Sequence, residues 1–202
     1  MWQKKIFIVL LILQGVAIFG QHQVTLLNGK IIEGRIDSIT PTEIKMYTIK
    51  KSSKPLYIER YRAFSVNLNG QDSVIYIQDS LYGNTLSAEQ MQFFVWGEQD
   101  AMNGYKPFVS SSIGFALGAA AGYFMVHEQV FLPVVVPVLY VPLQLIPKVK
   151  VNKKYVRDLS YLYQEDYLFG YERVARNRKV QRSFWYSMAG LVAGFVITSV
   201  AQ

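Results

Sequence analysis

Residues 108–126 read FVSSSIGFALGAAAGYFMV, nineteen positions without a charged side chain. Gly114, Gly118 and Gly122 recur at every fourth position, and Ser110 extends the row by one step. On a helix this spacing puts all four residues on one face, where a second backbone can approach closely. A helix of this length covers roughly 30 Å, the thickness of a membrane's hydrocarbon layer. The stretch predicts a transmembrane helix with a small-residue face.

The end of the chain repeats this pattern. Residues 184–202 are uncharged and carry Gly190, Gly194 and Thr198 at the same spacing. Two such faces predict helices that pack on each other or on another subunit. The alternative is a pair of tight core helices in a soluble protein. The helix-packing positions that we expect are Gly114, Gly118, Gly122, Gly190 and Gly194.

The segment between the two glycine-rich stretches is apolar but rich in proline. Residues 130–147 carry no charge, and their prolines stand at positions 133, 137, 142 and 147. Prolines remove helix hydrogen bonds, although membrane helices tolerate them where neighbours satisfy the freed carbonyls. We expect residues 108–147 to form a transmembrane helical hairpin with a kinked, proline-rich second arm. A re-entrant segment that dips into the membrane and returns is the alternative.

Residues 148–183 form a basic connector with ten basic and four acidic side chains. Its tyrosines at every fourth position would form one aromatic stripe on a helix. A basic helix with an aromatic face is typical of a segment on an anionic membrane surface. The residues expected at that surface are Lys153, Lys154, Arg157, Tyr163, Tyr167, Tyr171, Arg176 and Lys179. A solvated connector between two membrane spans is the alternative.

Two arguments disagree on the number of spans. The excess of Lys and Arg predicts that the connector stays cytoplasmic, which requires two spans. An internal echo favours three, because Gly97–Ala101 precedes the first glycine-rich helix and Gly170–Ala175 precedes the last. If both polar halves share one compartment, the spans point the same way and a return crossing must lie between them.

The first twenty residues predict an export signal. Lys4 and Lys5 form a positive region, and Ile6–Phe19 is an apolar core. Ala17 and Gly20 are small residues near a cleavage point after residue 20. An uncleaved anchor is the alternative, and in either case the following domain lies in the periplasm.

Residues 21–80 predict a small β-barrel of short strands. Asn28-Gly29 and Asn69-Gly70 are tight-turn dipeptides between alternating runs. Gly34 removes a side chain where a bent strand passes close to its neighbour. The expected strands lie at Val24–Leu27, Lys30–Ile39, 44–48, 56–59, 64–68 and Ser73–Ile77. This pattern resembles the Sm-like or SH3-like small barrel, which implies a binding or assembly module.

Residues 81–107 predict an amphipathic helix. Ser87 and Gln90 form a capping-box start, and Pro107 marks its end. Trp96 and Tyr105 suit a membrane–water boundary. The helix either docks the barrel against the bilayer or covers the open side of the barrel.

The composition excludes several chemistries. The chain has no cysteine, and its two histidines, His22 and His127, are isolated. Neither a zinc site nor a Ser-His-Asp arrangement can be assembled, and no phosphate-binding glycine loop follows a strand. We therefore expect no enzyme, no catalytic residue, no metal and no cofactor. The export signal argues against nucleic acid, and no small-molecule substrate is evident.

The complete layout, with its short motifs Gly97–Ala101 and Gly170-Tyr171, resembles a group of uncharacterised envelope membrane proteins of Gram-negative bacteria. The resemblance implies a location and no activity. We expect an α+β protein of the inner membrane, and a location in the outer membrane is the alternative. Its periplasmic β-barrel would bind a protein partner, and its glycine-zipper transmembrane helices would drive assembly in a complex or a homo-oligomer in contact with membrane lipid. The alternatives are a small transport or permeation element and a sensor of anionic lipid surfaces that uses the basic, Tyr-striped helix.

Overall fold

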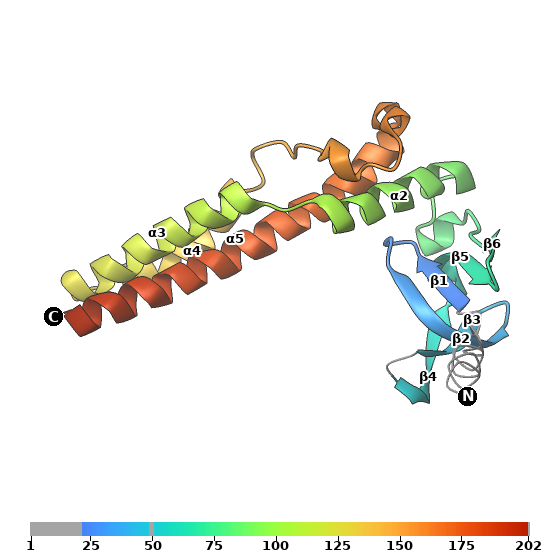
Figure 1. Ribbon diagram of the computed structural model, residues 1–202, viewed down its shortest axis with the longest axis horizontal. Coiled ribbons are helices and arrows are strands. Elements are labelled where there is room, and N and C mark those ends of the chain that lie inside the picture. The colour runs from blue at the N-terminus through green and yellow to red at the C-terminus, as the bar shows by residue number, and fades with distance from the viewer. Residues whose placement is uncertain (1–21, 49–50, 202) are drawn as a thin grey trace, which may run out of the picture. The chain divides into compact units, whose positions relative to one another are not determined.

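A computed structural model describes residues 22–48 and 51–201 of the chain. The chain divides into two compact units, one ending at Ala88 and the other beginning at Glu89. The first is an antiparallel sheet and the second is helical, so the protein is α+β (Figure 1).

Six strands form the sheet of the first unit in the order β4-β3-β2-β1-β5-β6, with every neighbouring pair antiparallel. Their bounds are β1 His22–Leu26, β2 Ile31–Ile39, β3 Glu43–Thr48, β4 Lys51–Glu59, β5 Ala63–Leu68 and β6 Gln71–Val74. β6 begins earlier than the expected Ser73. The reason is the Asn69-Gly70 turn, where both residues have positive φ angles of 53° and 90°. Such a two-residue turn leads directly into the next strand, so Leu68 pairs with Gln71.

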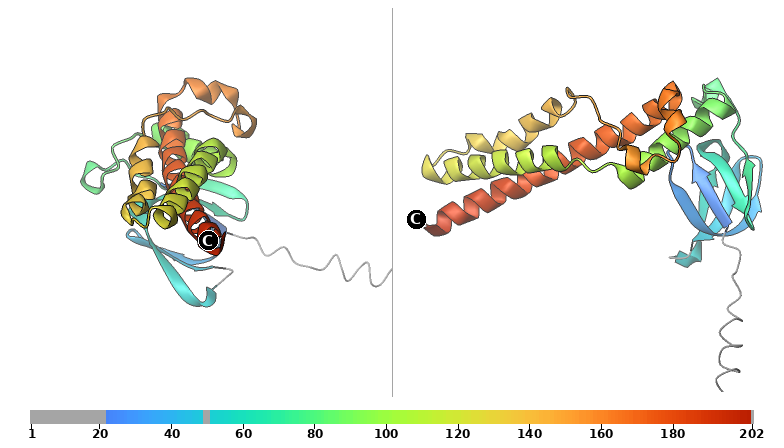
Figure 2. Two further views of the ribbon diagram at one scale, coloured as in Figure 1. Left: turned by 90° about the vertical axis from the view of Figure 1, so that its left-hand side faces the viewer. Right: turned by 45° about the horizontal axis from the view of Figure 1, so that its top comes forward.

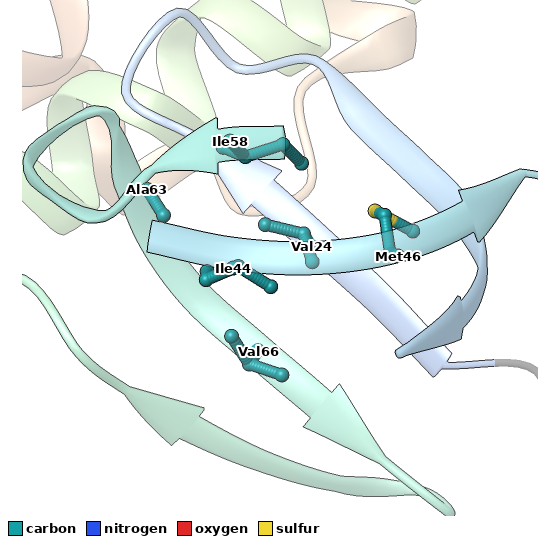
Figure 3. Packing of buried hydrophobic residues seen from close by; sticks show 6 residues of the cluster. All are labelled: Val24, Ile44, Met46, Ile58, Ala63 and Val66. Atoms are coloured by element: carbon teal, nitrogen blue, oxygen red, sulfur yellow. The ribbon is translucent and has the colours of Figure 1, made fainter. Parts of the chain in front are cut away.

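The core of the sheet consists of one buried side-chain cluster, shown in Figure 3. It contains Val24, Ile44, Met46, Ile58, Ala63 and Val66. These residues come from β1, β3, β4 and β5, so one face of the curved sheet encloses the cluster. Gly34 lies at a close strand contact, because a Cβ atom there would overlap the carbonyl group of Tyr47. The sequence predicts this close contact from the glycine at position 34.

Four α-helices and three short 3-10 turns build the second unit. The helices are α2 Ala88–Gly104, α3 Phe108–His127, α4 Val136–Leu143 and α5 Glu165–Ala201. The 3-10 turns lie at Leu132–Val135, Lys153–Tyr155 and Leu159–Tyr163. α2, α3 and α5 point in the same direction, and the two views of Figure 2 agree with Figure 1 that α4 lies beside α3.

α5 is one continuous helix of 37 residues. The sequence suggests a connector that stops at residue 183 before a separate terminal helix, and no break occurs there. Residues 165–201 contain no proline and only isolated glycines, so nothing interrupts the helical hydrogen bonds. α2 and α3, in contrast, are separated at Pro107.

The proline-rich arm is helical over a short length only. Its helical part comprises the 3-10 turn Leu132–Val135 and α4, and residues 144–152 are irregular. Pro142 stands inside α4 and Pro147 follows it closely. Prolines at this spacing leave too few main-chain donors for a long helix. The kinked helical arm expected over residues 130–147 is therefore a short helix followed by irregular chain.

Candidate functional site

The glycine row of α3 lies against the main chain of α5. A Cβ atom added to Gly118 would overlap the carbonyl oxygen of Ser187, and one added to Gly122 would overlap that of Leu191. At Gly114 the added atom would lie 2.9 Å from another α5 carbonyl oxygen. No side chain larger than hydrogen fits at these positions while the helices keep this separation.

The contact is reciprocal. Added Cβ atoms at Gly190 and Gly194 of α5 would overlap the carbonyl groups of Phe115 and Ala119 in α3. Gly190 thus faces Phe115, three positions before Gly118. In the same way, Gly118 faces Ser187, three positions before Gly190. Because contacting residue numbers rise together along both helices, α3 and α5 are parallel.

α2 and the first half of α5 make the same contact. Gly97 lies against the carbonyl group of Tyr167, and Gly170 lies against that of Phe94. Gly97 and Gly170 are 73 positions apart, whereas the matching glycines of α3 and α5 are 72 apart. The pair α2–α3 and the helix α5 are therefore two similar halves related by an approximate twofold axis along the helices.

The outer surface of the helix pair is apolar. The exposed fraction is 78% for Phe108, 68% for Ile197 and 83% for Val200. Small residues inside and large apolar residues outside reverse the pattern of a water-soluble bundle. α3 and α5 are also the two helices in the described residues that are long and apolar enough to cross a membrane.

The segment after α3 runs back along both helices. Val136 packs on the buried cluster near the end of α3. The Tyr140 hydroxyl donates to the Ser110 carbonyl at 2.7 Å, near the start of α3. Further on, the Asn152 side-chain amide donates to the Gly104 carbonyl at the end of α2. The chain thus returns from the far end of α3 to the level of α2 before α5 begins.

Glu98 is a carboxylate inside the α2–α5 contact. Its side chain is fully buried, and its Oε1 lies 2.6 Å from Nη2 of Arg173, which is half exposed. Its Oε2 has no hydrogen-bond partner within the described part of the chain. Burial raises the pKa of Glu98 to about 7, and the neighbouring guanidinium of Arg173 acts in the opposite direction.

Asp100 ties the returning chain to α2 and α5. Its Oδ2 accepts hydrogen bonds from the Tyr167 hydroxyl at 2.8 Å and the Arg157 main-chain N–H at 3.0 Å. Its Oδ1 accepts from the Arg157 side chain at 3.1 and 3.2 Å. Arg157 also lies over the Trp96 ring, on which Tyr161 stacks. Burial and the Asp100 carboxylate raise the pKa of Tyr167, so its hydroxyl keeps its proton and donates.

The aromatic stripe expected on the connector does not form. Tyr167 and Tyr171 are 0% and 1% exposed, because they lie in the contact between α5 and α2. Tyr163 is exposed but precedes α5 in a short 3-10 turn. Lys153 and Lys154 are exposed in another such turn. These residues therefore present no common helical face to a membrane surface.

Three basic side chains of α5 bind main-chain carbonyl groups. Arg178 donates to carbonyls near the C-terminus of α2. Arg176 donates to the Leu145 carbonyl at 3.0 Å, and the buried Lys179 to the Pro147 carbonyl at 3.4 Å, both just after α4. Cations at helix C-termini satisfy unpaired carbonyls and stabilise the helix dipole. Arg176 and Lys179 thus hold the returning chain, which differs from the lipid contact expected of them.

The sheet unit carries a separate groove of about 410 Å³. Its walls come from the start of β3, the end of β4 and residues 75–84. Tyr61 and Tyr82 stack beside it with ring centroids 5.0 Å apart, and the Tyr61 hydroxyl donates to Glu59 at 2.8 Å. The Asn84 side-chain amide donates to the Tyr61 carbonyl at 3.0 Å and holds this wall in place.

Residues 22–48 and 51–201 contain no group of three His, Asp or Glu side chains that could hold a metal ion. The chain matches no protein-family model, no curated protein and no solved structure. Its candidate sites are therefore the glycine-lined helix pair and the groove of the sheet unit.

Proposed function

We propose that the protein is a membrane-anchored structural or adaptor subunit of a bacterial envelope complex. The parallel glycine contact between α3 and α5, with large apolar side chains exposed around it, carries this proposal. Such an apolar outer surface is stable in contact with lipid. The glycine rows act as a zipper within one chain, so the anchor assembles without a second subunit.

Chain direction supports an anchor whose polar parts all lie on one side of the membrane. If parallel helices α3 and α5 both cross, the segment between them must return, and residues 132–152 follow that path. The sheet unit, α2, the connector and the first half of α5 then share one compartment. Only the turn after α3 and the end of α5 reach the other side.

An adaptor also agrees with the distribution of polar groups. The buried carboxylates Glu98 and Asp100 are bound by arginine and tyrosine side chains within their own unit. A permeation path is less well supported, because the interior of the α3–α5 pair is filled by main-chain contacts at Gly118 and Gly190. The sheet unit, with its groove, is the part available to a partner.

Two topology rules disagree on the side of the membrane on which the sheet unit lies. The export signal predicted at residues 1–20 favours the periplasm for the sheet unit. Lys106, Lys148, Lys150 and Arg182, which flank the apolar segments at the end opposite the α3–α4 turn, would place it in the cytoplasm. We favour the periplasm, because the predicted export signal precedes all other topology signals, whether it is cleaved or kept as an anchor.

Single cysteines at Gln78, Glu128 and Glu165, which are exposed, test this arrangement in a chain that has none of its own. We expect a membrane-impermeant thiol reagent to label Cys variants at 78 and 165 on intact spheroplasts, and the variant at 128 only after permeabilisation. Labelling of 78 and 165 from opposite sides would overturn the one-sided anchor. Labelling of 128 alone would overturn the periplasmic orientation. Release of the chain by alkaline carbonate would overturn the membrane anchor itself.

A further inference from the structure

The groove of the sheet unit has an unusual set of charges. Three carboxylates line it, from Glu43, Glu59 and Asp79, against one arginine, Arg60. Arg60 takes part in no ion pair within residues 22–48 and 51–201, and its Nε lies buried, out of reach of a bound ligand. Glu59 is paired with Arg62, whose Nη1 lies 3.5 Å from Glu59 Oε2, whereas Glu43 and Asp79 have no ion-pair partner in the described part of the chain. The groove therefore carries an excess of negative charge.

The rest of the groove is apolar or aromatic. Ile75 and Ile77 line it, and Ile77 is 63% exposed. The stacked pair Tyr61 and Tyr82 forms a further wall, with exposed fractions of 41% and 62%. Exposed aromatic rings beside carboxylates favour a ligand with a cationic group and an apolar body. A volume of about 410 Å³ accommodates a few side chains of a ligand.

We propose that this groove binds an extended segment of a partner protein in which a lysine or arginine adjoins an apolar residue. A peptide supplies two complementary groups together. Its cationic side chain pairs with the carboxylates, and its apolar side chain packs on Ile77 and Tyr82. A small organic cation such as tetramethylammonium lacks the apolar side chain. This inference rests on the proposed adaptor function and identifies the part that recognises the partner.

Fluorescence anisotropy of the full chain in detergent tests the assignment with two labelled probes. One is acetyl-Gly-Leu-Lys-Leu-Lys-Gly-amide, and the other has glutamate in place of both lysines. We expect the lysine peptide to bind at least about tenfold more tightly, and its affinity to fall as salt rises. Equal binding of both peptides would overturn the proposal. Equally strong competition by tetramethylammonium would replace the peptide with a small cation as the ligand.

Matched charge reversals locate the binding site. Glu43 lines the groove, whereas Glu33 is exposed on β2 and does not line it. We expect Glu43→Lys to weaken binding of the lysine peptide by about tenfold or more and Glu33→Lys to leave it unchanged. Equal effects of both variants would remove the groove from the interaction. If binding fails while the thiol labelling pattern persists, only the groove assignment is wrong; a changed labelling pattern refutes the anchor instead.

Discussion

Single glycines decide how closely the two long helices approach. Gly118 and Gly190 each face a main-chain carbonyl of the other helix, so an added side chain meets backbone that cannot rotate away. Close contact of two main chains also allows weak Cα–H···O interactions. The every-fourth spacing predicts this face from the sequence, because the position of a glycine fixes which side of a helix lacks side chains.

Gly118→Leu is expected to lower the stability of the helical unit by about 3 kcal/mol, because the leucine forces the α3 and α5 backbones apart. Unfolding by SDS in mixed micelles measures the change. Ala116→Leu is the matched control, since Ala116 is exposed on the same helix and its replacement meets no backbone. Equal stability of the two variants would contradict the close contact.

The buried carboxylate of Glu98 makes the helical unit sensitive to pH. Its pKa in the folded chain, about 7, lies above the ordinary value of 4.5, so the folded state favours the protonated form. The stabilisation is complete below about pH 4.5 and is lost as the pH rises through about 7, with an upper limit of about 3 kcal/mol.

We expect Glu98→Gln to remove most of this pH dependence, because glutamine occupies the same space without ionising. Thermal unfolding in detergent at pH 5 and pH 8 measures the effect. Glu172→Gln, which alters a half-exposed carboxylate bound to Arg176, should keep the wild-type dependence. A wild-type chain that is equally stable at both pH values would refute the argument.

At the scale of elements, the irregular chain between α4 and α5 is tied to α2 at Asp100, in addition to the hydrogen bond between Asn152 and Gly104. Asp100 receives hydrogen bonds from Arg157 and Tyr167 and is almost fully buried. Removing it leaves the Arg157 main-chain N–H and the buried Tyr167 hydroxyl without their acceptor, and it leaves the Arg157 guanidinium with Gln99 as its acceptor.

Asp100→Ala should therefore release this segment, so that the main chain after Arg157 fits the active site of trypsin more often. A loss of about 2 kcal/mol corresponds to roughly 30-fold more of the open form. Limited proteolysis followed by mass spectrometry measures cleavage after Arg157. Asp166→Asn, in the first turn of α5, is the control and should be cleaved at the wild-type rate. Unchanged cleavage of Asp100→Ala would contradict the tethering role.

Helices and strands differ in how far their sequences predict them. The strands follow from alternation and the Asn-Gly turns, and α3 follows from its glycine spacing. The sequence does not predict the continuity of α5. The change from basic to apolar residues near Ser183 suggests a helix end, although no residue there interrupts the helical hydrogen bonds. Tyr167 and Tyr171 point to a surface stripe by spacing alone, yet Gly97 and Gly170 beside them let α2 approach and bury them.

The buried polar contacts could not be predicted from the sequence. Glu98 and Asp100 appear as ordinary charges on the polar side of an amphipathic helix. Their partners Arg173 and Arg157 lie more than fifty residues away, so only the folded chain brings them together. The groove beside Tyr61 likewise depends on residues 75–84 folding against Tyr61 and Phe64.

For the whole molecule, the helical unit consists of two similar halves, and only the amino-terminal ends of those halves are polar. α3 and the second half of α5 match in glycine spacing, whereas α2 and the first half of α5 carry the charges. The sheet unit and the helical unit each contain a buried apolar cluster of their own.

The glycines of α3 and α5 recur at every fourth position, which raises the question of what fixes the register of the two helices. If α5 slid by four residues, Gly118 would again meet a carbonyl of α5, so the row on α3 alone does not choose the register. The row on α5 has only Gly190 and Gly194, and a slide would bring Tyr186 or Thr198 against the α3 main chain. The polar ends add a second restriction. A slide in one direction would set Glu98 against Asn177 instead of Arg173, and a slide in the other would set it against Phe169. Val174 or Asp166 would then fill the place of Gly170 and strike α2. The repeated glycines allow the close approach, and the ends of the α5 row together with Gly170 outside the apolar region fix the register at which the helices stop.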